Sequence, residues 1–338
     1  MAAAAGRDLV FHPAGPDAAL RAALEDLQAG RWMAMRALLA ETGTDWAVRT
    51  ARTQVLGAAA ARSNVLGAWR AEEPGSADLG VMQARVSVEH ALLAHRKQDR
   101  NEAAITQRAR EACWAAGRRL PNDPVPWVCL LALAQADERQ QRPEHYLPAP
   151  EPMLSPGPWG LLGEADHRDP FNREAFHRML RFSLARAAGS PGEAVDFARY
   201  VGSVAPEGSP LLVLPLYAYV ERYREMRDSG RLSPLLRGQW AADHVRHHAD
   251  RALHGWFEQP ATGPRAPLDL NHLAHALWAG DRFEAAHRVF SQIGPYATHL
   301  PWAHVADSPE QAEEEFRWAR NQCRLAGPDA RGRPGHKF

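Results

Sequence analysis

Residues 273–302 read LAHALWAGDRFEAAHRVFSQIGPYATHLPW, and this stretch decides the fold class of the chain. It divides into two helical segments separated by a tight break at Gly280 and Asp281, and a proline-marked turn follows the second segment. A helix, a short break, a second helix and a turn form the unit of a helical repeat protein. Scaffolds built from such units usually hold other molecules rather than transform them.

The same pattern recurs upstream as a spacing of small, apolar and proline residues. In such a unit a small residue on the second helix lets the first helix approach closely, an apolar residue follows one turn later, and proline closes the helix. This spacing fits two sets of residues, Ala109, Cys113 and Pro121, and Ala194, Ala198 and Pro206. On these residues the chain resembles the tetratricopeptide-like superfamily of α-helical repeats. The resemblance implies an all-α fold, a right-handed α-solenoid of antiparallel helix pairs with no sheet.

A narrower resemblance concerns RDPFNREAFHRML, residues 168–180, and the segment at 187–221 that follows it. Together they are similar to a bacterial family known only as a domain of unknown function. Members of that family have a Trp-Gly-Gly-Ser element where this chain has Ala-Ala-Gly-Ser at 187–190, so two positions depart from the pattern. The resemblance implies an uncharacterised helical-repeat domain and supplies no activity.

Proline and glycine divide the chain into segments of different character. Seven prolines fall between residues 143 and 170, where they interrupt every possible helix. A connection of this length is typical of a lid, a binding segment or a hinge, or of an inserted linker between two halves of a solenoid. We therefore expect a flexible N-terminus (1–16), a helical-repeat half (17–142), a Pro-rich connecting loop (143–170), a second helical-repeat half packed on the first (171–325) and a disordered tail (326–338).

The amino-acid composition limits the kinds of partner that the chain can attract. Lys and Arg number 40, and so do Asp and Glu, so no overall field recruits nucleic acid or an anionic membrane. The first residues lack the apolar core of a secretory signal, and no run approaches the roughly 18 apolar residues that a membrane span needs. Three cysteines at wide spacing suit buried thiols in a reducing compartment. We expect a cytoplasmic protein with no cofactor.

One tryptophan and two arginines supply the candidate partner surface. Trp159 stands in the segment SPGPWG, where a residue with no helical face must tuck into a groove or wait for a partner. Arg178 and Arg181 belong to an arginine-rich face that either reads an acidic peptide or phosphate, or is simply solvated beside its neighbouring acids. We predict a non-enzymatic scaffold that binds a protein or peptide partner through these residues.

A histidine-rich helix within residues 238–257 is the basis of an alternative prediction, a metal site. His244 and His248 lie one turn apart and face the same way, so the pair can hold a metal ion if a third ligand approaches. The candidates for that ligand are His272, His275 and Asp243. Such a site would make the chain a metal-dependent, hydrolase-like enzyme, although the zinc-protease signature, a phosphate loop and a nucleophile elbow are absent. The competing interpretation places these histidines on the flanks of a buried helical ridge.

Overall fold

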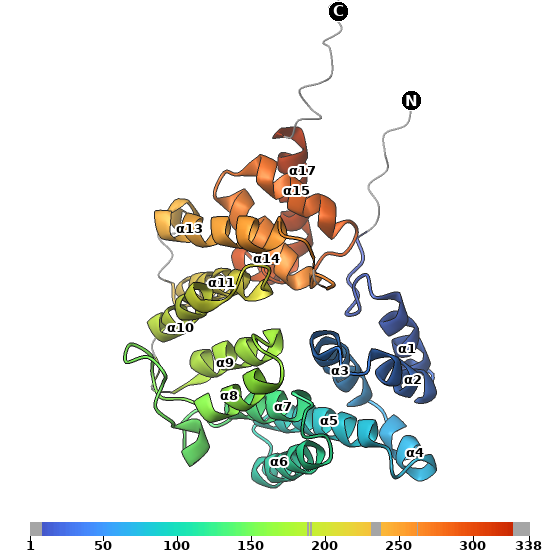
Figure 1. The fold of residues 1–338 in the computed structure, drawn as a ribbon. Helices are drawn as coiled ribbons and strands as arrows, with labels where there is room; N and C mark the ends of the chain where they lie inside the picture. The colour runs from blue at the N-terminus through green and yellow to red at the C-terminus, as the bar shows by residue number, and fades with distance from the viewer. Residues whose placement is uncertain (1–8, 188, 190, 231–237, 262, 327–338) are drawn as a thin grey trace, which may run out of the picture. The chain divides into compact units, whose positions relative to one another are not determined.

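The structure is a computed structural model, and it describes residues 9–187, 189, 191–230, 238–261 and 263–326 (Figure 1). Sixteen α-helices and several short helical turns account for the ordered elements of these residues, which include no β-strand. The prediction of an all-α fold is confirmed. None of the described helices is long and apolar enough to cross a membrane.

Contacts divide the chain into two compact units. We call Pro16–Phe197 the N-terminal unit, and we call the described residues of Ala198–Phe338 and Met1–Gly15 the C-terminal unit. The division falls inside helix α10 (Pro191–Val204), whereas the proline pattern placed the connection at 143–170. The two differ because prolines interrupt helices without interrupting packing, and the proline-rich segment stays attached to the helices on both sides of it.

The N-terminal unit is built around α7, a helix that is apolar on all sides. All its residues except Trp127 are buried, and α5, α6, α8 and α9 pack around it. Polar side chains begin several of the helices; Asp17, for example, accepts a hydrogen bond from the backbone N–H of Leu20, 2.9 Å away. The helices are α1 (Ala18–Gln28), α2 (Met33–Thr42), α3 (Trp46–Ala60), α4 (Val65–Glu72), α5 (Ala77–Arg96), α6 (Glu102–Arg119), α7 (Val125–Ala134), α8 (Trp159–Arg168) and α9 (Arg173–Ala185).

Helix α8 lies within the segment predicted as an irregular connection. Pro158 immediately precedes it, and no proline follows until Pro170. A proline just before the first turn of a helix is tolerated because the N–H that it lacks has no partner inside the helix. The irregular connection is therefore shorter than the proline count indicated, and it ends at residue 158.

Charged side chains are part of the N-terminal unit's core. The Arg85 guanidinium donates to both carboxylate oxygens of Glu174, each 2.7 Å away, and both side chains are 4% exposed. Arg178 donates to the same carboxylate. A second buried pair joins Arg49 to Asp123. The first pair connects helices α5 and α9, and the second connects α3 with the turn that precedes α7.

In the C-terminal unit the quoted stretch folds as two consecutive helices, α14 and α15, with the break at Gly280 and Asp281. The backbone of Asp281 has a φ of +60°, which reverses the chain between the helices. Helix α17 packs against α15 and ends at Ala326. The rest of the predicted tail, residues 327–338, lies outside the described residues. The helices are α11 (Leu214–Asp228), α13 (Asp243–Ala252), α14 (Pro267–Ala279), α15 (Phe283–Ile293), α16 (Trp302–Val305) and α17 (Ala312–Ala326).

Aromatic rings fill the core of the C-terminal unit. Trp302 is fully buried, and its indole N–H donates to the Asn271 side-chain oxygen, 2.9 Å away. Its ring centroid lies 5.4 Å from those of His275 and Phe316 and 6.0 Å from that of Phe290. Rings from α14, α15, α16 and α17 therefore meet around one tryptophan.

The N-terminal residues that the structure describes are bound to the C-terminal unit. The predicted flexible segment was 1–16, of which residues 1–8 lie outside the described part. The Val10 N–H donates to the Pro295 carbonyl oxygen, and the Phe11 ring stacks on His299. The prediction rested on local composition, which carries no information about partners nearly 300 residues away.

Candidate functional site

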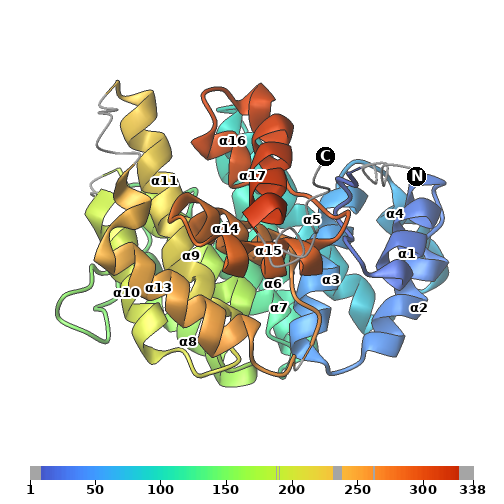
Figure 2. The ribbon, with the colours of Figure 1, turned by 90° about the horizontal axis from the view of Figure 1, so that it is seen from above.

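The connection between α7 and α8 folds into a closed loop. The N–H of Leu147 donates to the Gly157 carbonyl oxygen, and the N–H of Gly157 donates to that of Leu147, both at 2.9 Å. In both ribbon views the green connection between these helices extends as a loop (Figures 1 and 2). A Cβ atom at Gly157 would lie 2.9 Å from the Met179 terminal methyl and 3.2 Å from the Phe182 ring, so the loop closes tightly against α9 at this glycine.

Polar side chains anchor the base of this loop. The Gln140 amide donates to the carbonyl oxygens of His145 and Pro156, which lie on opposite sides of the loop. Asp137 accepts hydrogen bonds from two backbone N–H groups and from the His145 imidazole at 2.8 Å. Burial alone would raise the pKa of Asp137, but these donors hold it below its usual value. The base is therefore held by several independent contacts.

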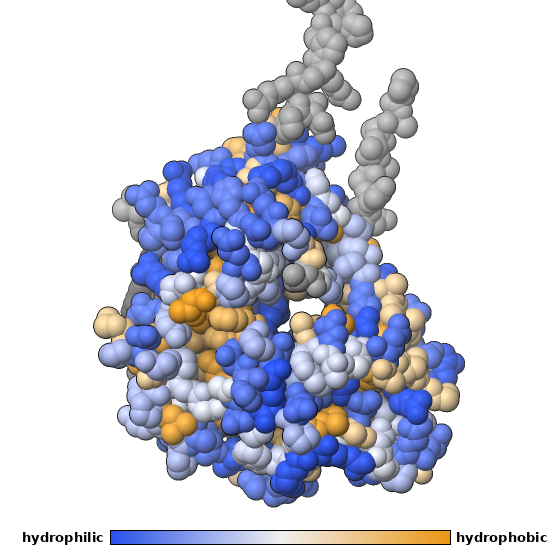
Figure 3. Space-filling view, in the orientation of Figure 1, coloured by the Kyte–Doolittle hydropathy of each residue, from blue (hydrophilic) through white to orange (hydrophobic). Residues whose placement is uncertain are grey.

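Three apolar side chains are exposed at this loop: Tyr146 just before the closing pair, Leu147 in that pair and Met153 beyond it. Met153 is 89% exposed, Tyr146 is 60% exposed, and Leu147 is 39% exposed. We call these three residues the loop surface. On the face of the molecule drawn in Figure 3, hydrophobic residues form small groups among hydrophilic ones. Three exposed apolar residues on one short, anchored loop are notable because a buried position would be more favourable for each of them.

A small cavity lies beside the loop, with a volume of about 10 Å³, which is no more than one water molecule needs. Of the two alternatives for Trp159, the structure shows the tucked one, since the ring lines this cavity. Its indole N–H donates to the Ser155 carbonyl oxygen at 3.0 Å, and its ring meets the edge of Phe197. The other lining residues come from the loop, α9 and α10, and they are Leu154, Pro156, Met179, Phe182, Ser183, Arg186 and Glu193.

The two other predicted partner residues lie outside the cavity lining. Arg178 belongs to the buried ion-pair network with Glu174, and its side chain is 14% exposed. Arg181 is exposed on α9. The arginine that does line the cavity is Arg186, which forms an ion pair with Glu193 at the rim. Sequence reasoning also missed the loop surface, although apolar residues without helical spacing in a proline-rich segment were a signal for it.

The four histidines of the metal alternative are not placed as ligands of one ion. His244 and His248 face the Tyr219 ring, with centroid distances of 5.5 and 6.0 Å. His272 is buried and donates through Nδ1 to the Leu268 carbonyl oxygen, 2.9 Å away. His275 packs between tryptophans, and burial lowers its pKa to about 3. Within the described residues no three His, Cys, Asp or Glu side chains are grouped to hold a metal ion.

This outcome has a simple geometric cause. The spacing of His244 and His248 puts them on one face of α13, as the sequence indicated. The direction in which the histidines of α14 point depends on the helices packed against it. His275 packs into the aromatic core of the C-terminal unit.

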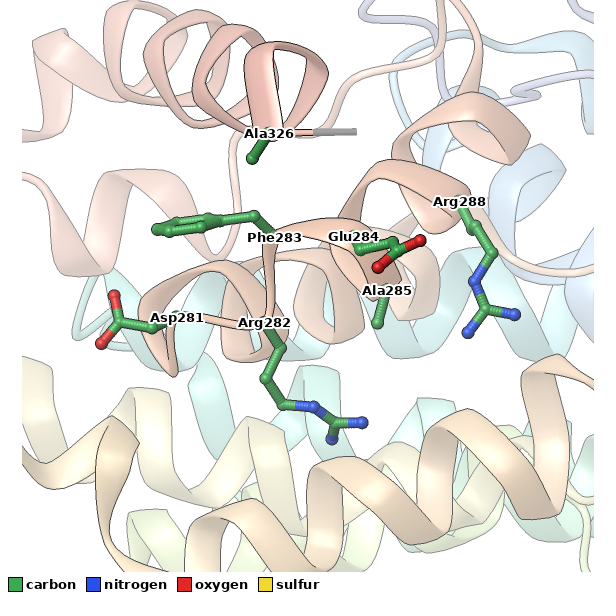
Figure 4. Close-up of a pocket in the computed structure, with 7 residues that line it drawn as sticks. All are labelled: Asp281, Arg282, Phe283, Glu284, Ala285, Arg288 and Ala326. Atoms are coloured by element: carbon green, nitrogen blue, oxygen red, sulfur yellow. The ribbon is translucent and has the colours of Figure 1, made fainter. Parts of the chain in front are cut away.

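A wide, open hollow lies at the start of α15 (Figure 4). Its lining is Asp281, Arg282, Phe283, Glu284, Ala285, Arg288 and Ala326. Arg282 forms an ion pair with Asp250, and Arg288 pairs with Glu258 at 2.6 Å. Figure 4 shows both arginines extending away from Ala326. Because these charges are already neutralised by partners, the hollow is a weaker candidate than the cavity beside Trp159.

Comparison of the chain with protein-family models, with curated proteins and with solved structures gave no match. The function is therefore argued from the chain's own residues. The loop surface and the Trp159 cavity lie side by side in the N-terminal unit, and together they form the candidate site.

Proposed function

We propose that the chain is a non-enzymatic helical scaffold that binds a protein or peptide segment through the loop surface and the Trp159 cavity. The observation that carries this proposal is the exposure of Met153 and Tyr146 on a loop whose two ends are tied together. Burying apolar surface stabilises a complex by about 25 cal/mol for each Å² removed from water. A partner that covers this loop therefore gains free energy from side chains that the folded chain leaves exposed.

The anchoring of the loop supports a binding role. A segment that is already ordered loses less conformational entropy when it binds than a disordered one does. The closed base provides this order, and tyrosine is among the residues that most often dominate binding energy at interfaces. The cavity beside the loop is too small to take a partner side chain, so we expect the partner to contact the residues around it. The Arg186 and Glu193 charges at its rim suit polar flanking residues.

The scaffold that we propose is a right-handed solenoid of antiparallel helix pairs, similar to the tetratricopeptide-like repeats. Consecutive helices that pack against each other support this arrangement, namely α1 with α2, α5 with α6 and α14 with α15. The Gly280 break between α14 and α15 is the turn expected of such a pair. An experimentally determined structure of the full chain would test the handedness and the number of pairs.

Peptide selection on the full-length protein tests the binding proposal. A random peptide library is panned on the wild-type chain, and the affinities of the selected peptides are then measured by fluorescence polarisation. We expect the double variant Tyr146→Ser/Met153→Ser to lose most of the affinity, because both apolar contacts disappear. The matched control is Met33→Ser, which removes an exposed methionine from α2 of the same unit and is expected to have no effect.

A second variant examines the cavity separately from the loop surface. Ser183→Leu places a larger side chain in the cavity while Tyr146 and Met153 remain. Weaker binding by this variant is expected if the partner contacts the residues around the cavity, because a leucine in so small a space displaces them. The proposal fails if no peptide is selected, or if the selected peptides bind the wild type and the Tyr146→Ser/Met153→Ser variant equally well.

A further inference from the structure

Three helices of the C-terminal unit bring cationic side chains together around Tyr219. The Arg199 Nε on α10 donates to the hydroxyl oxygen of Tyr219 on α11, 3.2 Å away. From α13, His244 and His248 present their rings to the same tyrosine, with centroid distances of 5.5 and 6.0 Å. Tyr219 is 2% exposed, so its hydroxyl group is a fixed point around which these side chains are arranged.

Helical spacing adds two more arginines to this group. Arg222 lies three residues after Tyr219 on α11, and Arg251 lies three residues after His248 on α13, so each shares a face with its neighbour. Helices α10 and α13 approach closely at this point, because a Cβ atom at Gly202 would lie 4.0 Å from His248 Nδ1. We call Arg199, Tyr219, Arg222, His244, His248 and Arg251 the cationic cluster.

The charges of this cluster lack the carboxylate partners that other arginines have. Within the part of the chain that the structure describes, Arg222 and Arg251 form no ion pair, and the partner of Arg199 is a neutral phenol. In the same unit Arg224, Arg227, Arg282, Arg288 and Arg317 each form an ion pair with a carboxylate. Exposed arginines on separate faces need no partner. Here Arg199 and Arg222 act electrostatically on His244, and Arg199 and Arg251 act on His248, so like charges lie close together and repel each other. An anion would relieve this repulsion.

We propose that the cationic cluster is a binding site for a phosphoryl group. Guanidinium groups donate pairs of parallel hydrogen bonds to phosphate oxygens, and three of them suit a dianion better than a single carboxylate. The Tyr219 hydroxyl and the two imidazoles supply further donors at the same place. The site uses no residue of the loop surface or the Trp159 cavity, so it stands independently of the proposed peptide binding.

The histidines make this site sensitive to pH. Burial, and after it the neighbouring charges of His247, Arg199 and Arg251, lower the pKa of His248 to about 4. The pKa of His244 is lowered by burial and then by Arg199 and Arg222, while Asp243 opposes the effect. A bound dianion favours the protonated imidazoles and so raises both pKa values. Protons are then taken up by the imidazoles on binding, which favours binding as the pH falls towards their pKa values for as long as the phosphoryl group remains a dianion. The charged or titratable groups facing His248 are Arg199, Tyr219, His244, His247 and Arg251.

Calorimetric titration of the full chain with inorganic pyrophosphate tests the site. We expect saturable binding to one site, weakened about tenfold or more in Arg222→Gln/Arg251→Gln, since each charged hydrogen bond contributes on the order of 1 kcal/mol. The matched control is Arg108→Gln/Arg118→Gln, which removes two exposed arginines from α6 and changes the net charge equally. This control should bind pyrophosphate like the wild type.

Two further measurements use the wild-type protein alone. The first distinguishes the possible sources of the phosphoryl group, and the second follows the protonation of a histidine at the site. A phosphoserine peptide and its unphosphorylated form are titrated beside pyrophosphate; binding of the phosphopeptide alone identifies a modified protein as the source, and binding of pyrophosphate alone identifies a small molecule. In the wild type, the NMR signal of the His248 ring is expected to report a higher pKa when ligand is bound. The proposal is overturned if neither probe saturates, or if both double variants lose affinity equally.

Discussion

The cores of the two units are stabilised by different interactions. In the N-terminal unit, Arg85 and Glu174 form a buried ion pair that Arg178 extends. In the C-terminal unit, the corresponding interior positions hold rings, with Trp302 at the centre and an uncharged His275 beside it. An ion pair in a core is stable only while both partners remain, because a single buried charge is costly. A ring cluster depends instead on volume and on a few hydrogen bonds.

This difference predicts different vulnerabilities. The pKa of Glu174 would be raised by burial, but Arg85 and Arg178 hold it below its usual value. Its contribution to stability is therefore present above the unfolded-state pKa and is lost as the pH falls through the lowered folded-state value. The pKa of His275 is lowered by burial alone, so its neutral form suits the core and its protonated form does not. The core around Glu174 depends on its charges, and the ring cluster around Trp302 depends on a neutral His275.

The largest effect is expected from Glu174→Gln. The variant leaves Arg85 buried without a carboxylate, which destabilises the N-terminal unit by about 3–5 kcal/mol. Hydrogen exchange of the full chain, followed by mass spectrometry, would show faster exchange in peptides of Pro16–Phe197. The double variant Arg85→Met/Glu174→Leu should recover much of the loss, because it removes both charges and keeps the volume. A double variant as unstable as the single one would contradict this account.

The second effect concerns acid and the C-terminal unit. An unfolded imidazole takes up a proton near pH 6.5, whereas buried His275 resists it down to about pH 3, so falling pH favours the unfolded state. The expected loss is roughly 3 kcal/mol at pH 4 compared with pH 7. Urea unfolding of His275→Leu at both pH values should show a smaller loss than the wild type. An identical pH dependence in the two proteins would mean that His275 is not the group responsible.

The smallest effect is expected from Trp302→Phe. The ring cluster keeps most of its volume, but the Asn271 oxygen loses the indole N–H that bonds to it in the core. The variant leaves a buried acceptor without a donor and places a smaller ring in the core, which lowers the free energy of unfolding by about 1–3 kcal/mol. Urea unfolding would show this as a lower midpoint concentration. The control is Trp318→Phe on α17, where a tryptophan that is 52% exposed should change stability by less than about 0.5 kcal/mol. Equal losses at the two positions would show that burial does not set the cost.

Helices were predicted well where one segment carried its own pattern. The periodicity of residues 273–302 and the Gly280 break anticipated α14 and α15, because hydrophobic spacing and glycine act over a few residues. The proline-rich segment was predicted less well. Its prolines correctly indicated an interrupted chain, but they did not reveal that α8 begins directly after Pro158 or that Leu147 pairs with Gly157.

The candidate site residues also differ in how well the sequence predicted their surroundings. Trp159 was selected from the sequence because a loop tryptophan needs a place for its ring, and it lines the cavity. Arg178 was selected for its charge, but it is engaged with Glu174 on its own helix. The His244 and His248 pair was placed correctly on one helical face, whereas its arginine neighbours came from α10 and α11 and could not be inferred from spacing along α13.

The sequence by itself determined that the chain is helical, that residues 273–302 form two helices separated at Gly280, and which residues share a helical face. These properties depend on hydrogen bonds and side-chain spacing within about one or two turns. Only the tertiary structure decided that Arg85 meets Glu174, 89 residues away, that His275 is enclosed by tryptophans, and that the loop between α7 and α8 is closed with Met153 outside. Such contacts depend on how whole helices pack, and packing is a property of surfaces that assemble only when the chain has folded.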